Sequence, residues 1–266
     1  MPLINLGSAT LDYEIEGQGP VILFAHGAGG NRLSWWQQVP YFMDRYSCVT
    51  FSHPGFGRSD WIGDVSDRVS YSDVLLELLD HLEIERVALI AQSMGGWTCL
   101  PVAVRLPDRV AARFMASTPG NLSTPEIDQA REANRERLEE LRQAWEERSV
   151  GSFNPALGER CFTEQPGMHY LYSTIQGLNQ PRASRPGIDI TPEEMSDYRT
   201  PTMYLTGEED VVLPSSMIAA AAAVTPGAHL ERVPETGHSI YFERPDVFNS
   251  LLSAFLNKVY PTWTCG

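Results

Sequence analysis

The chain has 266 residues, of which 42% are hydrophobic, and this is enough for one large domain with a substantial core. It carries 20 basic and 34 acidic residues, a net charge of −14, so its surface is expected to repel nucleic acids and anionic membranes. No apolar run reaches the roughly 18 residues of a membrane helix, and the N-terminus lacks the pattern of a secretory signal. We therefore expect a cytoplasmic protein without nucleic-acid or membrane partners.

The four cysteines, Cys48, Cys99, Cys161 and Cys265, lie far apart in the sequence. None is paired at a spacing typical of a zinc site or a redox dithiol. The sequence therefore predicts no metal, no cofactor and no disulfide.

In chain order, the sequence predicts an antiparallel hairpin and then strands that alternate with helices. Residues 10–16 alternate apolar and polar side chains, as in a half-buried strand, and residues 2–6 are expected to pair with them. Further strand-like runs follow at residues 21–25, 48–51, 87–90, 110–116, 202–205 and 229–233, and we interpret them as strands covered on both faces. Helical patterns occupy residues 33–43, 71–82, 94–106, 215–224 and 245–259. The predicted fold class is α/β, with a mostly parallel, twisted sheet of eight strands flanked by helices.

Residues 120–199 break this alternation because they contain no strand-like run. Residues 125–149 are densely charged and helical in pattern, with Thr124 as the predicted N-cap and Pro125 at the first helical position. A more apolar part follows, with Phe153, Phe162, Met168, Tyr170, Tyr172, Ile175 and Leu178. We interpret residues 120–199 as a helical lid on a core of residues 1–119 and 200–260, with 261–266 as a C-terminal tail. The alternative is a structural appendage with a core of its own.

The segment from Val87 to Trp97 carries the most informative pattern of the chain. Strand-like residues run directly into Ser93, and a helical pattern follows at once. A serine hydroxyl becomes a good nucleophile when a base lies beside it and a tight strand-to-helix turn projects its oxygen, which requires small residues two positions away. Ala91 and Gly95 meet this requirement. Taken alone, the pattern also fits an ordinary turn whose serine caps the helix.

A nucleophilic serine needs a histidine base and a carboxylate that fixes the tautomer of the histidine. The chain offers both downstream of Ser93. Residues 202–205 lead into a glycine turn with Glu209 and Asp210, and residues 229–233 lead into Gly237-His238. These groups follow predicted strands, at the edge where open α/β sheets gather their sites.

On these motifs the sequence resembles the α/β-hydrolase family over nearly its whole length, and in particular small bacterial esterases and enol-lactone hydrolases. The resemblance implies a catalytic triad of Ser93, Asp210 and His238, with Glu209 as the less favoured acid. It also implies, from His26-Gly27-Ala28, that the backbone amides of Ala28 and Met94 form an oxyanion hole and that His26 is structural.

The sequence departs from the family pattern in two segments. The loop after the fourth strand reads Ser52-His53-Pro54-Gly55-Phe56-Gly57-Arg58-Ser59, with serine in place of the usual acid and proline in place of the usual arginine. Since this loop supports the site, the departure affects the shape of the pocket more than the chemistry. Ala91 stands where the first glycine of the elbow is usual.

Candidate pocket residues are the aromatic side chains and one histidine near these motifs or in the insertion: Trp35, Trp36, Trp97, Trp145, His169 and Tyr172. For Trp35 and Trp36, packing in the core fits the sequence equally well. His53, His81 and His229 have no motif around them and are expected to be surface or hydrogen-bonded residues.

The expected reaction is hydrolysis of a carboxylic ester or lactone of a small molecule through an acyl-enzyme on Ser93, in a monomer or homodimer. Two alternatives stay open. One is hydrolysis of a carbon–carbon bond in a vinylogous diketone, since that related group also has Met-Gly-Gly after its serine; the other is a ligand-sensing protein of the same fold. A cofactor-free perhydrolase would use the same residues.

Overall fold

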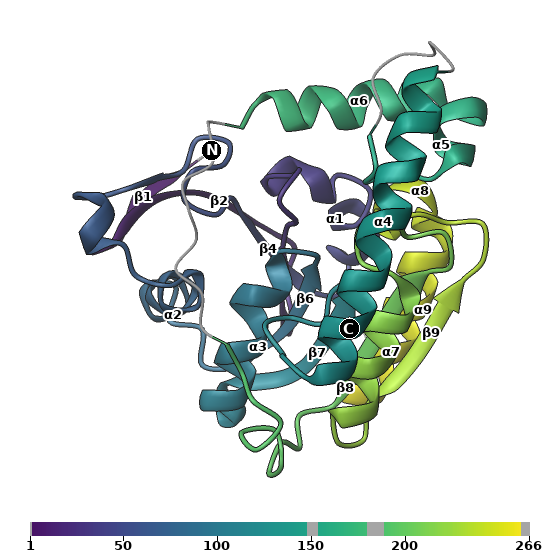
Figure 1. Cartoon of the computed structure of the whole chain (residues 1–266). Coiled ribbons are helices and arrows are strands. Elements are labelled where there is room, and N and C mark those ends of the chain that lie inside the picture. The colour runs from purple at the N-terminus through teal and green to yellow at the C-terminus, as the bar shows by residue number, and fades with distance from the viewer. Residues whose placement is uncertain (1, 148–153, 180–188, 262–266) are drawn as a thin grey trace.

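The computed structural model describes residues 2–147, 154–179 and 189–261. Its centre is a nine-stranded sheet with the strand order β1-β2-β4-β3-β6-β7-β8-β9, and β5 pairs with β2 (Figure 1). The strands from β4 onward in this order are parallel, while β2 runs antiparallel to β1, β4 and β5. The bounds are β1 (Leu3–Asn5), β2 (Ala9–Glu16), β3 (Val21–Ala25), β4 (Ser47–Phe51), β5 (Asp60–Trp61), β6 (Val87–Gln92), β7 (Val110–Ala116), β8 (Thr202–Gly207) and β9 (His229–Val233).

All eight predicted strands are present, and the α/β fold class is confirmed. The ninth strand, β5, was not predicted because two residues are too short to show an alternating pattern. It adds to β2 through the pairs Ala9 with Trp61 and Thr10 with Asp60.

The α-helices are α1 (Val39–Phe42), α2 (Tyr71–His81), α3 (Gly95–Arg105), α4 (Pro125–Glu147), α5 (Glu159–Glu164), α6 (Pro166–Gly177), α7 (Ser215–Val224), α8 (Ile240–Glu243) and α9 (Pro245–Val259). Short 3-10 helices occupy Arg32–Trp35, Val65–Asp67 and Pro107–Arg109. None of the helices in the described part of the chain combines the length and the apolar character needed to cross a membrane.

The single helix predicted for residues 33–43 is wrong. The structure has a 3-10 helix at Arg32–Trp35, capped by the side chain of Asn31, and then a separate helix α1. Pro40 lies in the first turn of α1, where its missing N–H is tolerated, whereas in the middle of a longer helix it would remove a hydrogen bond. Pro40 therefore favours a new helix, α1, beginning at this point.

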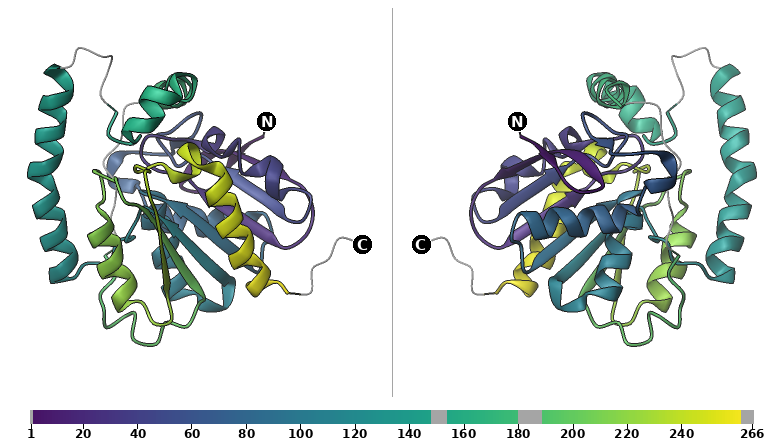
Figure 2. Two further views of the ribbon diagram at one scale, coloured as in Figure 1. Left: turned by 90° about the vertical axis from the view of Figure 1, so that its right-hand side faces the viewer. Right: turned by 90° about the vertical axis from the view of Figure 1, so that its left-hand side faces the viewer.

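The sheet is covered on both faces, and its strands alternate side chains between the two cores (Figure 2). In β3, Leu23 and Ala25 join the core formed with α2, α3 and α7, while Ile22 and Phe24 join the core formed with α8 and α9. This period-two exchange explains why β3 is apolar at every position.

The helices α4, α5 and α6 form the insertion between β7 and β8 (Figure 1). The predicted cap is confirmed, because the N–H of Ile127 donates to Thr124 Oγ1 over 3.2 Å and Pro125 begins the helix. The Asn134 side chain donates to the Val211 carbonyl, which ties α4 to the segment before α7. The role of this insertion as a lid stays a prediction.

The end of α6 is fixed to the core by Asn179. Its Oδ1 accepts from Asn31 Nδ2 over 3.2 Å and from the N–H of Gly57 over 3.1 Å, and its Nδ2 donates to the Gly29 carbonyl over 3.4 Å. One amide side chain therefore joins the insertion to the loops that follow β3 and β4.

Arg113 on β7 is a fully buried cation without a carboxylate partner among the described residues. Its guanidinium lies over the rings of Tyr198 and Tyr204, at 4.9 and 5.7 Å from their centroids. Its Nε and Nη1 have no hydrogen-bond partner in this part of the structure. Since burying a charge is costly, Arg113→Met is expected to raise the free energy of unfolding by about 1–3 kcal/mol.

The matched control is Arg32→Met. Arg32 is also buried, but its Nε lies 3.1 Å from Asp12 Oδ2 and its Nη1 lies 2.7 Å from Glu14 Oε2. Removing it leaves the buried Asp12 carboxylate uncompensated, so the free energy of unfolding should fall by about 3 kcal/mol. Denaturant unfolding of both variants measures this, and a loss of stability of similar size in the two would contradict the interpretation.

Candidate active site

Ser93 lies in a tight turn between β6 and α3. Its φ is +49°, in the left-handed region that residues other than glycine rarely adopt. Its N–H donates to the Ala116 carbonyl over 3.0 Å, which ties the turn to β7. A Cβ at Gly95 would overlap the Ala25 carbonyl of β3, so only glycine lets α3 begin this close to the sheet. The strand, turn and helix predicted around Ser93 are therefore present, with backbone strain at the serine itself.

Asp210 and His238 form a buried pair at the same edge of the sheet. Asp210 follows β8, His238 follows β9, and the distance from His238 Nδ1 to Asp210 Oδ2 is 2.8 Å. The other carboxylate oxygen, Oδ1, accepts from the N–H groups of Val212 and Leu213, both over 2.8 Å. The two side chains are 3% and 4% exposed as residues, so the pair is shielded from water. This arrangement fixes an Nδ1–H tautomer on the imidazole.

A close approach of two loops makes this pair possible. A Cβ at Gly207 would overlap the carbonyl oxygens of Thr236 and Gly237. Glycine at the end of β8 thus lets the loop that carries Asp210 touch the loop that carries His238. Glu209, the less favoured acid, is exposed, and its N–H donates to the Thr236 carbonyl over 3.0 Å.

Gln92 connects the elbow to the histidine loop. It immediately precedes Ser93, and its Nε2 donates to the His238 carbonyl over 3.4 Å. The hydrogen bonds of the described residues do not include one from Ser93 Oγ to His238 Nε2. That contact belongs to the proposal made below.

The loop after β3 passes beside the serine. A Cβ at Gly27 would overlap Gln92 Oε1 and would lie 3.1 Å from the Cβ of Ser93. The neighbouring amide of Ala28 and the amide of Met94, at the start of α3, donate no hydrogen bond among those described. Both amides therefore keep an N–H available near Ser93, and their role as an oxyanion hole stays a proposal.

Residues 22–251 match the sequence model of the alpha/beta hydrolase family. The chain belongs to this family. The dihydrolipoyllysine-residue acetyltransferase component of the acetoin cleaving system of Pseudomonas putida is 28% identical over 92% of the chain, which spans 66% of that longer protein. The 3-oxoadipate enol-lactonase 2 of Acinetobacter baylyi is 25% identical, and the match covers 93% of each chain. Among solved structures, a thermophilic esterase from Thermogutta terrifontis aligns with a TM-score of 0.74, 23% identity, and 97% and 99% of the two chains covered.

In this hydrolase, two buried histidines, His26 and His53, pack beside the loop after β3. His26 Nδ1 is 2.8 Å from the Gly27 carbonyl, and His26 Nε2 accepts from the backbone N–H of His53 over 2.9 Å. His53 Nδ1 lies 3.0 Å from the same Nε2, and His53 Nε2 lies 2.8 Å from Thr98 Oγ1. Burial lowers the pKa of His26 to about 4, and burial with the neighbouring His26 lowers the pKa of His53 well below its ordinary value. Both rings are thus neutral supports of the loop, as expected for residues outside the chemistry.

The loop that departs from the family pattern is accommodated by neutral hydrogen bonds. Ser52 Oγ, in the place of the usual acid, accepts from the N–H of Arg32 over 3.1 Å. Ser59 Oγ accepts from the N–H of Asp12 over 2.9 Å. The loop is therefore held without the acid and arginine that are usual there.

Trp35 does not line a pocket in this hydrolase. Its side chain is fully buried, and its ring centroid lies 4.7 Å from that of Tyr241 and 5.0 Å from that of Phe24. The prediction of a pocket role for Trp35 is wrong because the 3-10 helix turns this ring into the core. The next residue, Trp36, is 43% exposed beside Phe242 and lies at the surface.

Tyr172 on α6 contacts the residue next to His238. Its hydroxyl accepts from Ser239 Oγ over 3.3 Å, next to His238, and lies 3.0 Å from where a Cβ at Gly29 would be. It thus bridges the histidine loop and the loop after β3. We propose that Tyr172 forms part of the wall over the site.

The other pocket candidates have different outcomes. Trp97 is half-buried and lines a polar cavity of about 370 Å³ with Asn121 and Arg131, above the first turn of α3. His169 is half-buried on α6. The side chain of Trp145 lies outside the described residues. Roles for these three in substrate binding stay proposals.

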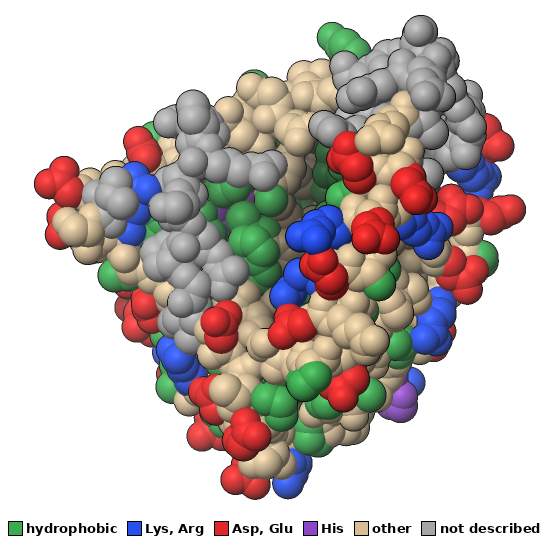
Figure 3. Space-filling view, viewed as in Figure 1, with side chains coloured by type: hydrophobic (Ala, Val, Ile, Leu, Met, Phe, Trp, Pro, Cys, Tyr) green, Lys and Arg blue, Asp and Glu red, His purple; other side chains and the backbone are tan. Residues whose placement is uncertain are grey.

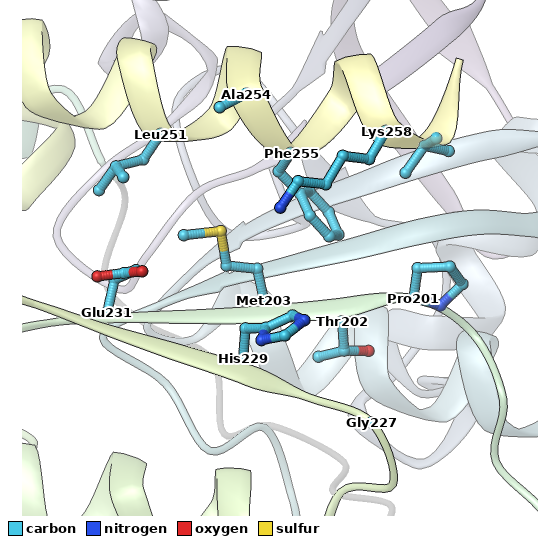
Figure 4. A pocket seen from close by; sticks show the side chains of 11 residues that line it. Pro201, Thr202, Met203, Gly227, His229, Glu231, Leu251, Ala254, Phe255 and Lys258 are labelled. Atoms are coloured by element: carbon cyan, nitrogen blue, oxygen red, sulfur yellow. The ribbon is translucent and has the colours of Figure 1, made fainter. Parts of the chain in front are cut away.

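The surface shows a hollow with hydrophobic side chains on its walls, beside α4 and below α6 (Figure 3). A second cavity, also of about 370 Å³, lies between α9 and the strands β8 and β9 (Figure 4). Its lining includes Met203, Phe255, Lys258 and Thr202, the residue where β8 begins. Ser93, Asp210 and His238 follow the opposite ends of their strands, so this second cavity is not the proposed catalytic pocket.

Sequence reasoning missed Glu243 near His238. Its carboxylate is buried and accepts hydrogen bonds from the backbone on either side of the histidine. The only sequence signal was an acid five residues after His238, which is common in helices. Among the described residues, no group of three or more histidine, cysteine, aspartate or glutamate side chains is arranged to hold a metal ion.

Proposed function

We propose that this hydrolase cleaves a carboxylic ester or lactone of a small molecule through an acyl-enzyme on Ser93. The observation that carries the proposal is the buried His238–Asp210 pair, 2.8 Å between Nδ1 and Oδ2, at the same sheet edge as the strained Ser93. A strained serine, a carboxylate-oriented imidazole and unused amides are the parts that acyl transfer needs. The enol-lactonase and esterase among the similar proteins support the same substrate class.

In the first half of the reaction, Ser93 Oγ attacks the carbonyl carbon while His238 Nε2 takes the hydroxyl proton. Asp210 holds Nδ1–H and stabilises the imidazolium that forms. The amides of Ala28 and Met94 donate to the oxyanion, each contributing about 3 kcal/mol to the stabilisation of the transition state. The intermediate collapses to the acyl-enzyme as His238 gives its proton to the leaving oxygen. In a lactone that oxygen stays on the same molecule.

In the second half, His238 removes a proton from water, which attacks the acyl carbon. The same amides hold the second oxyanion, and the proton returns to Ser93 as the acid leaves. Asp210 Oδ1, fixed by two backbone N–H groups, keeps the imidazole in one orientation through both halves.

Covalent labelling tests the nucleophile directly. An alkyl phosphonofluoridate should add one phosphonyl group to the purified protein, and peptide mass spectrometry should place it on Ser93. Ser93→Ala should not be labelled. Ser117→Ala is the matched control, because Ser117 also has a φ of +49° at the end of the neighbouring strand β7, and this variant should still be labelled. Labelling at another residue, or of Ser93→Ala at the parent rate, would end the proposal.

A substrate panel then separates the alternatives. Short aryl esters and lactones should give repeated turnovers, whereas a vinylogous diketone should be cleaved far more slowly. Fast cleavage of the diketone would instead favour the carbon–carbon hydrolase. One rapid burst followed by very slow turnover, with a large ligand-induced rise in Tm, would favour the ligand-sensing protein.

A further inference from the structure

The carboxylate of Glu243 holds the backbone on both sides of His238. Glu243 ends α8 and is 7% exposed. Its Oε2 accepts from the N–H of Gly237 over 3.2 Å, and its Oε1 accepts from the N–H of Ser239 over 3.2 Å. Because these residues flank His238, the two oxygens fix the backbone from which the imidazole projects.

The same carboxylate reaches the helical insertion. Gly158, just before α5, donates its N–H to Glu243 Oε2 over 2.9 Å. A Cβ at Gly158 would lie 2.8 Å from this oxygen and 3.0 Å from the Gly237 nitrogen. Only glycine allows the insertion to approach this closely, so one carboxylate joins the insertion to the histidine loop.

The surroundings of Glu243 combine burial with charged groups at the protein surface. Burial raises the pKa of Glu243, while hydrogen bonds from Gly158, Gly237 and Ser239 and the charge on His238 lower it. The thiol of Cys161, whose pKa burial and Glu243 raise to about 12, lines a small cavity beside it. This cavity is also lined by Glu235, by Arg160, which pairs with Glu164, and by Arg244, which pairs with Asp246.

We propose that Glu243 is a positioning residue for His238, which sets the place of the imidazole through Gly237 and Ser239 and couples it to the insertion at Gly158. This inference rests on the proposed function, in which His238 becomes an imidazolium as Ser93 attacks. A buried negative charge beside that imidazolium favours its formation. Glu243 therefore acts on the reaction through the backbone and through its charge, without touching the substrate.

Glu243→Gln tests the proposal with little change of shape. Glutamine presents one oxygen and one NH₂, so one of the backbone N–H groups flanking His238 would face a donor. With an aryl ester, kcat/KM should fall about 10²-fold, since a small misplacement of a reacting group has an effect of this order. The acid limb of the kcat/KM profile should also move to lower pH, because the imidazolium form of His238 loses a neighbouring negative charge.

Asn249→Ala is the matched control for a loss of stability alone. Asn249 is buried, its Nδ2 donates to the Gln37 carbonyl over 3.2 Å and its Oδ1 accepts from Gln38 Nε2 over 3.2 Å, so neither hydrogen bond is made to residues 237–239. At a temperature where both variants are folded by circular dichroism, Asn249→Ala should keep the parent acid limb. The proposal is overturned if Glu243→Gln keeps the parent kcat/KM and acid limb, or if Asn249→Ala shifts the limb equally.

A second variant decides the matter if Glu243→Gln does not fold. In Gly158→Ala, the added Cβ would lie 2.8 Å from Glu243 Oε2 and displace this carboxylate. The variant should therefore have a lower kcat/KM and a shifted acid limb. A folded Gly158→Ala with parent kinetics overturns the coupling. Phosphonate labelling of the parent separates this outcome from failure of the proposed function, because the parent would then be labelled at Ser93 whatever the role of Glu243.

Discussion

Asp210→Asn is expected to lower kcat for ester hydrolysis by about 10⁴-fold while the protein stays folded. Asp210 Oδ1 accepts from the N–H groups of Val212 and Leu213, so the asparagine oxygen must take that place. Its NH₂ then faces His238 Nδ1, which has to accept a hydrogen bond rather than donate one. The imidazole proton is forced onto Nε2, and His238 can no longer remove a proton from Ser93.

Steady-state kinetics on an aryl ester measure this effect, and thermal unfolding checks the fold. Glu209→Gln is the control, because Glu209 is the adjacent carboxylate, is exposed and does not contact His238; its kcat should stay close to that of the parent. If Asp210→Asn kept kcat within tenfold of the parent, or if Glu209→Gln lost it instead, the assignment of the acid would be wrong.

The second large effect is acid destabilisation by His26 and His53. Their folded-state pKa values lie below the ordinary value of 6.5, at about 4 for His26 and well below 6.5 for His53. The unfolded chain therefore binds these protons as the pH falls below 6.5, while the folded chain stays neutral there. Stability is complete above pH 6.5 and falls by up to about 1.4 kcal/mol per pH unit for each histidine. Between pH 6.5 and about 4, His26 alone should account for a loss of about 3 kcal/mol.

Urea unfolding at a series of pH values measures this slope. His53→Phe should reduce the pH dependence of stability, because only His26 of this pair can then take up a proton on unfolding. Phenylalanine suits the site, since the His53 ring packs against Phe51, Phe56 and Tyr71 and the backbone N–H of residue 53 still donates to His26. His81→Gln, at an exposed position on α2, should leave the slope unchanged. The raised pKa of Glu243 acts in the opposite sense in all these proteins, because the folded state binds that proton more readily than the unfolded chain, and the comparison between variants removes it. A parent stability that is constant from pH 7 to 4.5, or an equal slope in His53→Phe, would contradict the prediction.

Much of the scaffold was readable from the sequence because it depends on short-range patterns. The run at residues 87–90 is apolar at every position, and residues 110–116 are apolar except for Arg113, as expected for strands buried on both faces of a parallel sheet. The motifs after β6, β8 and β9 were placed at one sheet edge by topology alone, and the structure shows the contact between His238 and Asp210. Sequence patterns located best the residues that directly follow a strand, because the position of the strand in the sheet sets the position of the residue.

The features that were missed depend on contacts between distant segments. The two-residue strand β5 forms only because β2 offers an edge. Trp35 lies in the core because a 3-10 helix, capped by Asn31, turns its ring inward. The helical pattern of residues 33–43 could not show that this segment forms two short helices rather than one. Glu243 has a role only where the chain at Gly158 meets the chain at Gly237. None of these contacts has a local signature.

The cavity beside α9 has a practical consequence. Lys258, on its wall, is the only lysine in the sequence, and it lies near the start of β8 rather than at the edge that carries Asp210. Apart from the α-amino group, Lys258 is therefore the site at which amine-directed coupling to a bead or a sensor surface would attach the protein, through this face. Immobilised molecules would then share one orientation and present the opposite end of the sheet to the solution.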